Sequence, residues 1–136
     1  MAIEMSLLIL LTWIAIYDIK YHLIRNIDLL ILSALLIPYY KNWSIGMCNL
    51  FFYLLMNLIF RKKIGSGDIK ISLLIALPLD SLSGLLNAIS FTWILGGSYS
   101  LIHRSHTIAF APFMIYGTYL ARLLWDNDWI GNEISI

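Results

Sequence analysis

Two aspartates in this sequence have the side chains for acid–base chemistry as a pair. Asp68 lies in the stretch KKIGSGDIKI, residues 62–71, between two strongly apolar segments, and Asp18 closes the first apolar segment of the chain. Two carboxyl groups that share one proton can activate a water molecule, one acting as base and the other as acid, as they do in aspartic proteases. The fold would have to bring together two residues that are far apart in the sequence.

The expected helix ends assign different roles to the two acids. Asp68 is expected to open a helix, where the helix dipole favours the carboxylate, and Asp18 to end one, where it favours the neutral acid. This placement predicts Asp68 as the base and Asp18 as the acid. Gly65 and Gly67 allow a positive φ or the close approach of another chain, such as an extended substrate. An ordinary interhelical turn would require the same glycines.

The composition of the chain is that of a membrane protein. It has 136 residues, of which 60% are hydrophobic and 12% are charged, and its mean hydropathy is +0.81. A soluble domain has about a quarter of its residues charged. The net charge of +1 does not suggest nucleic acid as a partner. The single cysteine, Cys48, excludes an intrachain disulfide and a CxxC zinc site. We expect no metal and no cofactor.

Apolar segments separated by short polar stretches predict an all-α, polytopic membrane bundle of about six transmembrane helices in one domain, residues 1–136. The fourth segment is short, since its twelve or so residues cover roughly 18 Å of a hydrocarbon layer of roughly 30 Å. The alternative is a five-helix bundle in which the fourth and fifth segments form one element, broken at Pro78 and the following DSLSG. The six expected helices cover residues 2–18, 27–40, 43–60, 68–79, 82–102 and 107–125.

The positions of the basic residues predict the orientation of this bundle. The connections after the first, third and fifth helices hold seven of the nine Lys and Arg residues: Lys20, Arg25, Arg61, Lys62, Lys63, Lys70 and Arg104. The positive-inside rule places these connections in the cytoplasm and both termini outside it. The other side keeps only Lys41 and Arg122, with the acidic residues Asp80, Asp126, Asp128 and Glu133.

This orientation places Asp18 and Asp68 together at the cytoplasmic boundary. We interpret Asp28, Asp80, Asp126 and Asp128 as solvated helix ends. For Asp68 that interpretation is weaker, because a short helix draws its first residues toward the hydrocarbon. An acid at membrane depth is costly unless it faces a wet cavity, and it is a candidate functional residue for that reason.

GSGDIK, residues 65–70, resembles the GxGD signature of type IV prepilin peptidases, membrane aspartyl proteases related to archaeal preflagellin peptidases. Their first aspartate is followed, after five residues, by I-P-N, and DIKYHLIRN matches this pattern at Asp18, Ile24 and Asn26, with Arg25 at the position of the proline. FAPF, residues 110–113, resembles a late apolar motif of the family.

The resemblance implies an aspartic endopeptidase in the inner (plasma) membrane, with its active site facing the cytoplasm. Asp18 and Asp68 would be the catalytic pair, and Gly65, Gly67, Lys70 and Asn26 would bind substrate or support the site. The partners would be membrane lipid and a prepilin or pseudopilin-like precursor of a type IV pilus or secretion system, which loses a short basic leader.

Two features distinguish this chain from related membrane proteases. Larger members of the family carry an N-terminal part with paired cysteines that methylates the new amino terminus, so the single cysteine here predicts a form with peptidase activity alone. Presenilin-type proteases share the YD and GxGD motifs, but hold them at mid-membrane in a larger bundle.

The non-enzymatic alternative is a small transporter or pilus-assembly subunit in which the two acids carry protons or a cation.

Overall fold

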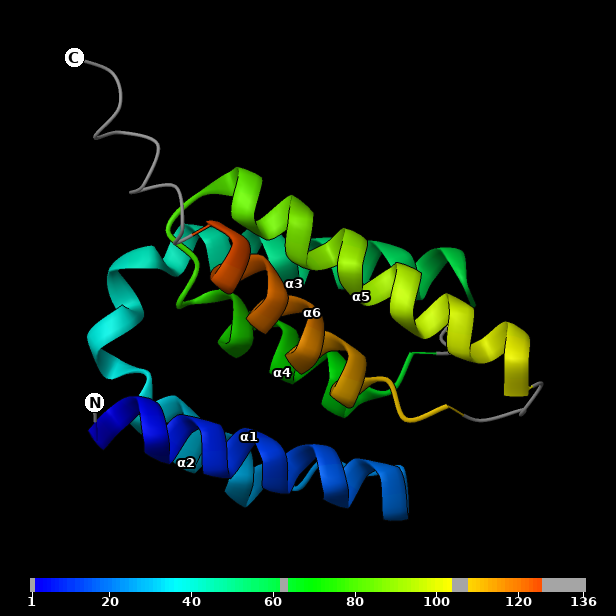
Figure 1. Cartoon of the computed structure of the whole chain (residues 1–136), viewed down its shortest axis with the longest axis horizontal. Helices are drawn as coiled ribbons and strands as arrows, with labels where there is room; N and C mark the ends of the chain where they lie inside the picture. The colour runs from blue at the N-terminus through cyan, green and yellow to red at the C-terminus, as the bar shows by residue number, and fades with distance from the viewer. Residues whose placement is uncertain (1, 62–63, 104–107, 126–136) are drawn as a thin grey trace.

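The computed structural model describes residues 2–61, 64–103 and 108–125, and this part of the chain is all-helical, without a strand (Figure 1). The predicted all-α class is therefore confirmed for the described residues. The elements are α1 (Ala2–Tyr21), α2 (Asn26–Leu35), the 3₁₀ helix η1 (Ile37–Asn42), α3 (Trp43–Ile59), α4 (Ser66–Ala76), α5 (Leu82–His103) and α6 (Ala111–Trp125).

Within the described residues α4 and α5 are separate elements, so the six expected segments are all present there as α-helices. Prolines explain where some boundaries differ from those expected. The second helix was expected to reach residue 40, but Pro38 cannot continue an α-helix and the chain turns into η1 instead. The sixth helix begins at Ala111, with Pro112 in its first turn, where a missing N–H group leaves no helical hydrogen bond unmade.

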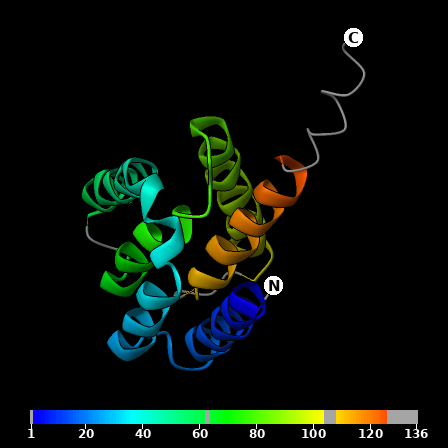
Figure 2. The ribbon, with the colours of Figure 1, turned by 90° about the vertical axis from the view of Figure 1, so that its left-hand side faces the viewer.

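The helices form three layers of two (Figure 2). The central layer contains α4 and α6, with α1 and α2 on one side and α3 and α5 on the other; α4 packs against α2, α3 and α6, and α6 packs against α1, α4 and α5. Because α4 has neighbours on several sides, it buries residues around its circumference and not along one face only. The buried residues are Ile71, Ser72 and the run Leu74–Ala76.

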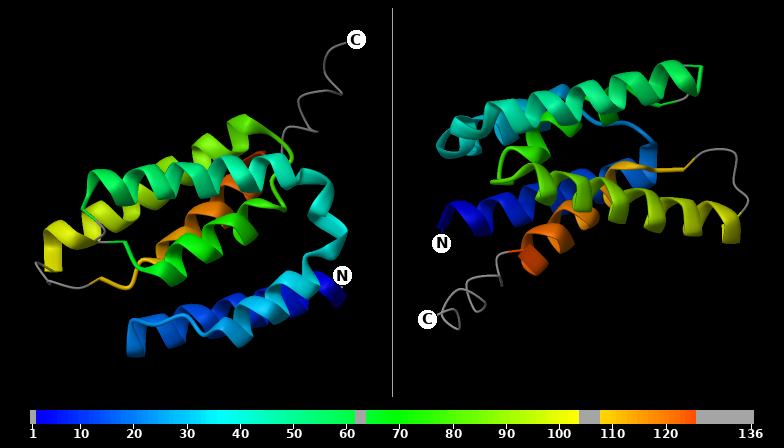
Figure 3. Two further views of the ribbon diagram at one scale, coloured as in Figure 1. Left: turned by 180° about the vertical axis from the view of Figure 1, so that it is seen from behind. Right: turned by 90° about the horizontal axis from the view of Figure 1, so that it is seen from above.

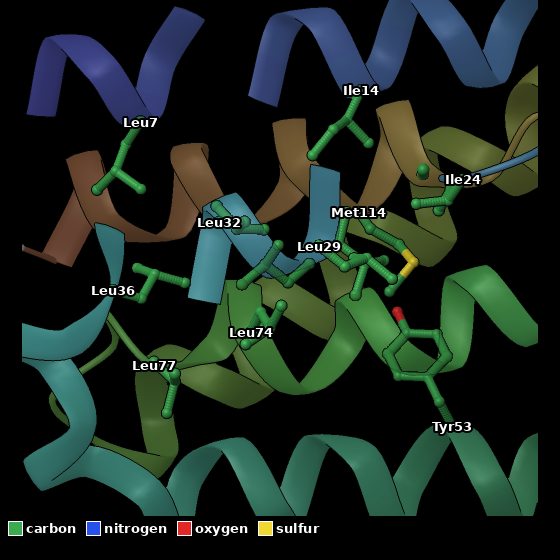
Figure 4. Packing of buried hydrophobic residues seen from close by; sticks show 13 residues of the cluster. Leu7, Ile14, Ile24, Leu29, Leu32, Leu36, Tyr53, Leu74, Leu77 and Met114 are labelled. Atoms are coloured by element: carbon green, nitrogen blue, oxygen red, sulfur yellow. The ribbon is translucent and has the colours of Figure 1, made fainter. Parts of the chain in front are cut away.

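The hydrophobic core lies between these layers (Figure 4). Leu29 and Leu32 of α2 meet Leu74 of α4 and Met114 of α6 there, and all four side chains are buried. On the far side of α4, the buried Tyr53 of α3 points toward the same interior. The core thus ties α4, the helix that carries Asp68, to both outer layers.

The chain runs up and down through the bundle (Figures 1 and 3). The ends of α1, α3 and α5 and the starts of α2, α4 and α6 lie at one end, which we name the basic end after Lys20, Arg25, Arg61 and Lys70. Lys41 and Arg122 lie at the opposite end. Of the residues used to predict orientation, Lys62, Lys63, Arg104, Asp126, Asp128 and Glu133 lie outside the described residues.

In the part of the chain that the structure describes, three helical segments are long and apolar enough to cross a membrane: Ala2–Tyr21, Ile37–Ile59 and Leu82–His103. In the apolar stretch of each segment, only 17 to 22% of the residues are buried inside the protein. Large side chains such as Ile9, Phe51 and Leu101 are 69%, 68% and 81% exposed. Contiguous apolar surface of this extent is rare on soluble monomers and is expected where lipid replaces water.

The contact of α5 with α6 depends on Gly117. A Cβ atom there would lie 2.8 Å from the backbone nitrogen of Thr92 and 3.0 Å from the carbonyl oxygen of Ala88, and neither backbone atom can move without moving α5. Gly97 on α5 is the matched control, since a Cβ atom there meets nothing within 4 Å.

We predict that Gly117→Ala lowers the free energy of unfolding by about 1–3 kcal/mol, the usual effect of overpacking. Gly97→Ala should change the free energy of unfolding by no more than about 1 kcal/mol, the difference in helix propensity between glycine and alanine, because the added methyl group meets no neighbour. Reversible unfolding in detergent, followed by tryptophan fluorescence, measures both. Equal stability of the two variants would contradict the described packing of α5 on α6.

Candidate active site

The residues singled out in the sequence surround one cavity at the basic end. Its volume is about 300 Å³. Both Asp18 and Asp68 line it, although they come from α1 in an outer layer and α4 in the central layer. The remaining lining residues come from the segment between α1 and α2 and from the start of α4: His22, Leu23, Ile24, Asn26, Gly65, Ser66, Gly67 and Lys70.

Asp18 is buried in the last turn of α1, with 5% of its surface exposed. Its Oδ2 atom accepts a hydrogen bond of 3.1 Å from the backbone N–H of Ala111, the first residue of α6. The first N–H groups of a helix have no partner within the helix and attract negative charge. The FAPF segment thus contacts the first aspartate directly, a contact that the sequence analysis did not anticipate.

Asp68 lies in the first turn of α4, three residues after the N-cap Gly65. The backbone of Gly65 bonds to its carboxyl group. The assignment of Asp68 as the base and Asp18 as the acid stays a prediction.

The glycines act through close packing and not through an unusual backbone. None of the described glycines has a positive φ. A Cβ atom at position 67 would lie 2.9 Å from the Cβ of Ile24, so only glycine lets α4 approach the segment after α1 this closely. A Cβ atom at Gly65 would lie 3.2 Å from Oδ2 of Asp68. The expected positive φ is therefore absent, Gly67 is explained by contact with Ile24 of the same chain, and the approach of a substrate stays a prediction.

Lys70 and Asn26 join the two motifs. The Nζ atom of Lys70 donates a hydrogen bond of 3.2 Å to Oδ1 of Asn26 at the start of α2. Ile24 is also buried, 9% exposed, against Gly67. The segment that follows Asp18 therefore contacts the segment around Asp68 at two positions, on either side of Arg25.

Arg25 and Asp28 form an ion pair beside the cavity. Nε and Nη2 of Arg25 donate hydrogen bonds of 2.9 and 2.8 Å to the two carboxylate oxygens of Asp28. Asp28 is only 3% exposed, so its interpretation as a solvated helix end is wrong. Asp80 is exposed, as expected, and accepts a hydrogen bond of 2.9 Å from Asn42.

His22 is a further polar residue of the cavity that the sequence analysis missed. It ends α1 with a φ of 50°, a left-handed backbone that stops the helix one turn after Asp18. Its spacing of four residues from Asp18 was a signal that could have placed it on the same side of α1. Among the described residues, no three His, Cys, Asp or Glu side chains gather as a metal site would require.

Comparison with known proteins identifies no family for this chain, so a functional assignment depends on its own residues. No protein-family model, no curated protein and no solved structure matches this chain. The likeness to type IV prepilin peptidases consists of three short motifs. In the structure, residues from all three lie at the same end of the bundle, and Asp18 contacts the third of them through Ala111.

Proposed function

We propose that this protein is a membrane aspartic endopeptidase that cleaves precursors resembling type IV prepilins. The observation that carries the proposal is the cavity at the basic end, which two carboxyl groups from separate helices border, the buried one of Asp18 and the partly buried one of Asp68. The likeness of residues 18–26, 65–70 and 110–113 to the motifs of that family supports the same reaction.

The chemistry would use one proton held between Asp18 and Asp68. The ionised carboxyl group removes a proton from a water molecule, whose oxygen adds to the carbonyl carbon of the substrate peptide. The protonated carboxyl group gives its proton to the carbonyl oxygen, so the intermediate is a neutral diol. When the C–N bond breaks, the protonated carboxyl group gives its proton to the leaving nitrogen and the other carboxylate takes a proton from a hydroxyl group of the diol. The products are an amine and a carboxylic acid, and the pair again holds one proton.

The location of the cavity favours a substrate that is cut next to its own membrane helix. The acids lie at an end of the bundle, beside four basic residues. A helix must lose backbone hydrogen bonds before a peptidase can hold it in extended form, and this loss is most costly inside hydrocarbon. We therefore propose that cleavage falls between a short basic leader and the apolar helix of the precursor. The resemblance adds a glycine before the cut, which eases the extension.

We propose further that the basic end faces the cytoplasm and that all six helices lie in the bacterial inner membrane, with α2, α4 and α6 held between the longer helices. The partition of the basic residues supports this orientation. No metal and no methyl donor would be required, and lipid would surround the exposed apolar faces.

Topology is the first test of this proposal. Alkaline phosphatase, which folds only outside the cytoplasm, should be active when fused after Lys41 or after the C-terminus and inactive when fused after Lys63. A β-galactosidase fusion at each position is the control and should give the opposite pattern. An active phosphatase after Lys63 would contradict the orientation.

Cleavage is the second test. When the protein is co-expressed with prepilins from the same genome, the precursor should lose its leader, which gel mobility and mass spectrometry detect. Asp18→Asn and Asp68→Asn should each lower cleavage by at least about 100-fold, because neither acid can replace the other. Lys41→Ala, at the opposite end of the bundle, is the matched control.

The same experiment decides against the non-enzymatic alternative. A transporter or an assembly subunit that uses the two acids to carry protons or a cation would leave every precursor uncut. In that case the asparagine variants would change ion uptake into vesicles and not the size of the precursor. Immunoblots of each variant separate loss of cleavage from loss of the protein.

A further inference from the structure

Arg25 holds the start of α2 against the end of α1. Its guanidinium group lies 5.0 Å from the ring centre of Tyr17 and 5.9 Å from that of Trp13, both on α1. Tyr17 is the residue directly before Asp18. The same guanidinium group makes both hydrogen bonds to the buried carboxylate of Asp28 on α2. Arg25 therefore bridges α1 and α2 beside Asp18.

The two neighbours of Arg25 reach α4. Ile24 packs on Gly67, and Asn26 accepts the hydrogen bond from Lys70. Consecutive residues of an extended backbone point in opposite directions, and Arg25 has extended dihedrals, with φ −77° and ψ 138°. Arg25 is held by its contacts with α1 and Asp28. Its two neighbours, Ile24 and Asn26, therefore point the other way, toward the segment that carries Asp68.

We propose that Arg25 is a positioning residue: through its ion pair with Asp28, it holds residues 24–26 so that the Asp18 and Asp68 segments keep the spacing seen in the cavity. The effect of Arg25 on the order of residues 24–26 does not depend on the proposed function. Its effect on catalysis rests on the proposed function. Arg25 lines no part of the cavity, so it would act through Ile24 and Asn26 and not on the substrate.

The backbone at Arg25 supplies a matched variant. A φ of −77° is within the range that proline imposes, and among the described residues the N–H of Arg25 donates no hydrogen bond that proline would remove. Proline would fix this backbone without an ion pair. It would also leave Asp28 buried and unpaired, so Asp28→Leu must accompany it; an apolar residue in place of a buried ion pair is often tolerated.

The first experiment is hydrogen–deuterium exchange by mass spectrometry on the full chain in detergent. Arg25→Ala should speed exchange in peptides that cover residues 22–30 and 64–70, because the first segment loses its anchor and the second loses two contacts. Arg25→Pro/Asp28→Leu should exchange like the wild type at residues 64–70. Arg25→Lys should resemble Arg25→Ala, because lysine keeps the charge but not the two-pronged donor. Lys41→Ala is the control for loss of a surface charge.

The second experiment measures cleavage of a purified precursor by the same variants. Arg25→Ala should lower kcat by roughly 10- to 100-fold, the effect of a small misplacement of catalytic groups, with KM little changed. The proline double variant should recover most of this loss. Such recovery separates a positioning role from a direct one, since proline has no charge to offer to substrate or acids.

Three results would overturn the proposal. They are wild-type exchange at residues 64–70 in Arg25→Ala, exchange in the double variant as fast as in Arg25→Ala, and wild-type behaviour of Arg25→Lys. If the wild type cuts no precursor, the proposed function fails, but the exchange experiment still decides whether Arg25 orders this segment. If the wild type cuts and Arg25→Ala cuts equally fast, the catalytic consequence fails alone.

Discussion

The fold has to hold a carboxyl group, that of Asp68, at the end of a buried apolar helix. Moving a carboxylate out of water carries a large free-energy cost, and a protein reduces it by keeping the group protonated, by hydrogen bonding or by leaving space for water. Asp68 shows the last two, because the backbone of Gly65 bonds to it and it borders a cavity of about 300 Å³. Other features of the basic end follow from these requirements.

The three-layer arrangement supplies the second acid from outside the central layer. Asp18 comes from α1, and α6 of the central layer presents its first N–H to it. A helix that starts at this depth leaves its first N–H groups without partners, and a buried carboxyl group satisfies one of them. The start of α6 and the burial of Asp18 therefore depend on each other. This relation gives FAPF, residues 110–113, a physical role: it ends the connection from α5 and starts α6 beside the acid.

Hydropathy and proline positions predicted the six helices, because membrane-length apolar segments and their breaks are properties of local sequence. The pairing of Asp18 with Asp68 in one cavity was also within reach, through the alternation of the helix ends. Long-range contacts were not. The hydrogen bond from Ala111 to Asp18 has no local signal. Arg25, in contrast, lies three residues before Asp28, a spacing at which side chains can pair, and the sequence analysis did not use it. The glycines were ambiguous because positive φ and close approach select the same residue, and only the contact of Gly67 with Ile24 separates them.

A second cavity shows that size alone does not locate the chemistry. It has a volume of about 290 Å³ and lies toward the opposite end, among α1, α2, α4 and α6. Its walls are mostly leucine and other apolar side chains, and the charged groups Glu4 and Arg122 along it pair with each other at 3.5 Å. Neither Asp18 nor Asp68 lines this cavity. At the basic end the two acids instead border the cavity together and each accepts a backbone hydrogen bond. Two carboxyl groups that border one cavity can share a proton, which is the arrangement that the proposed reaction needs.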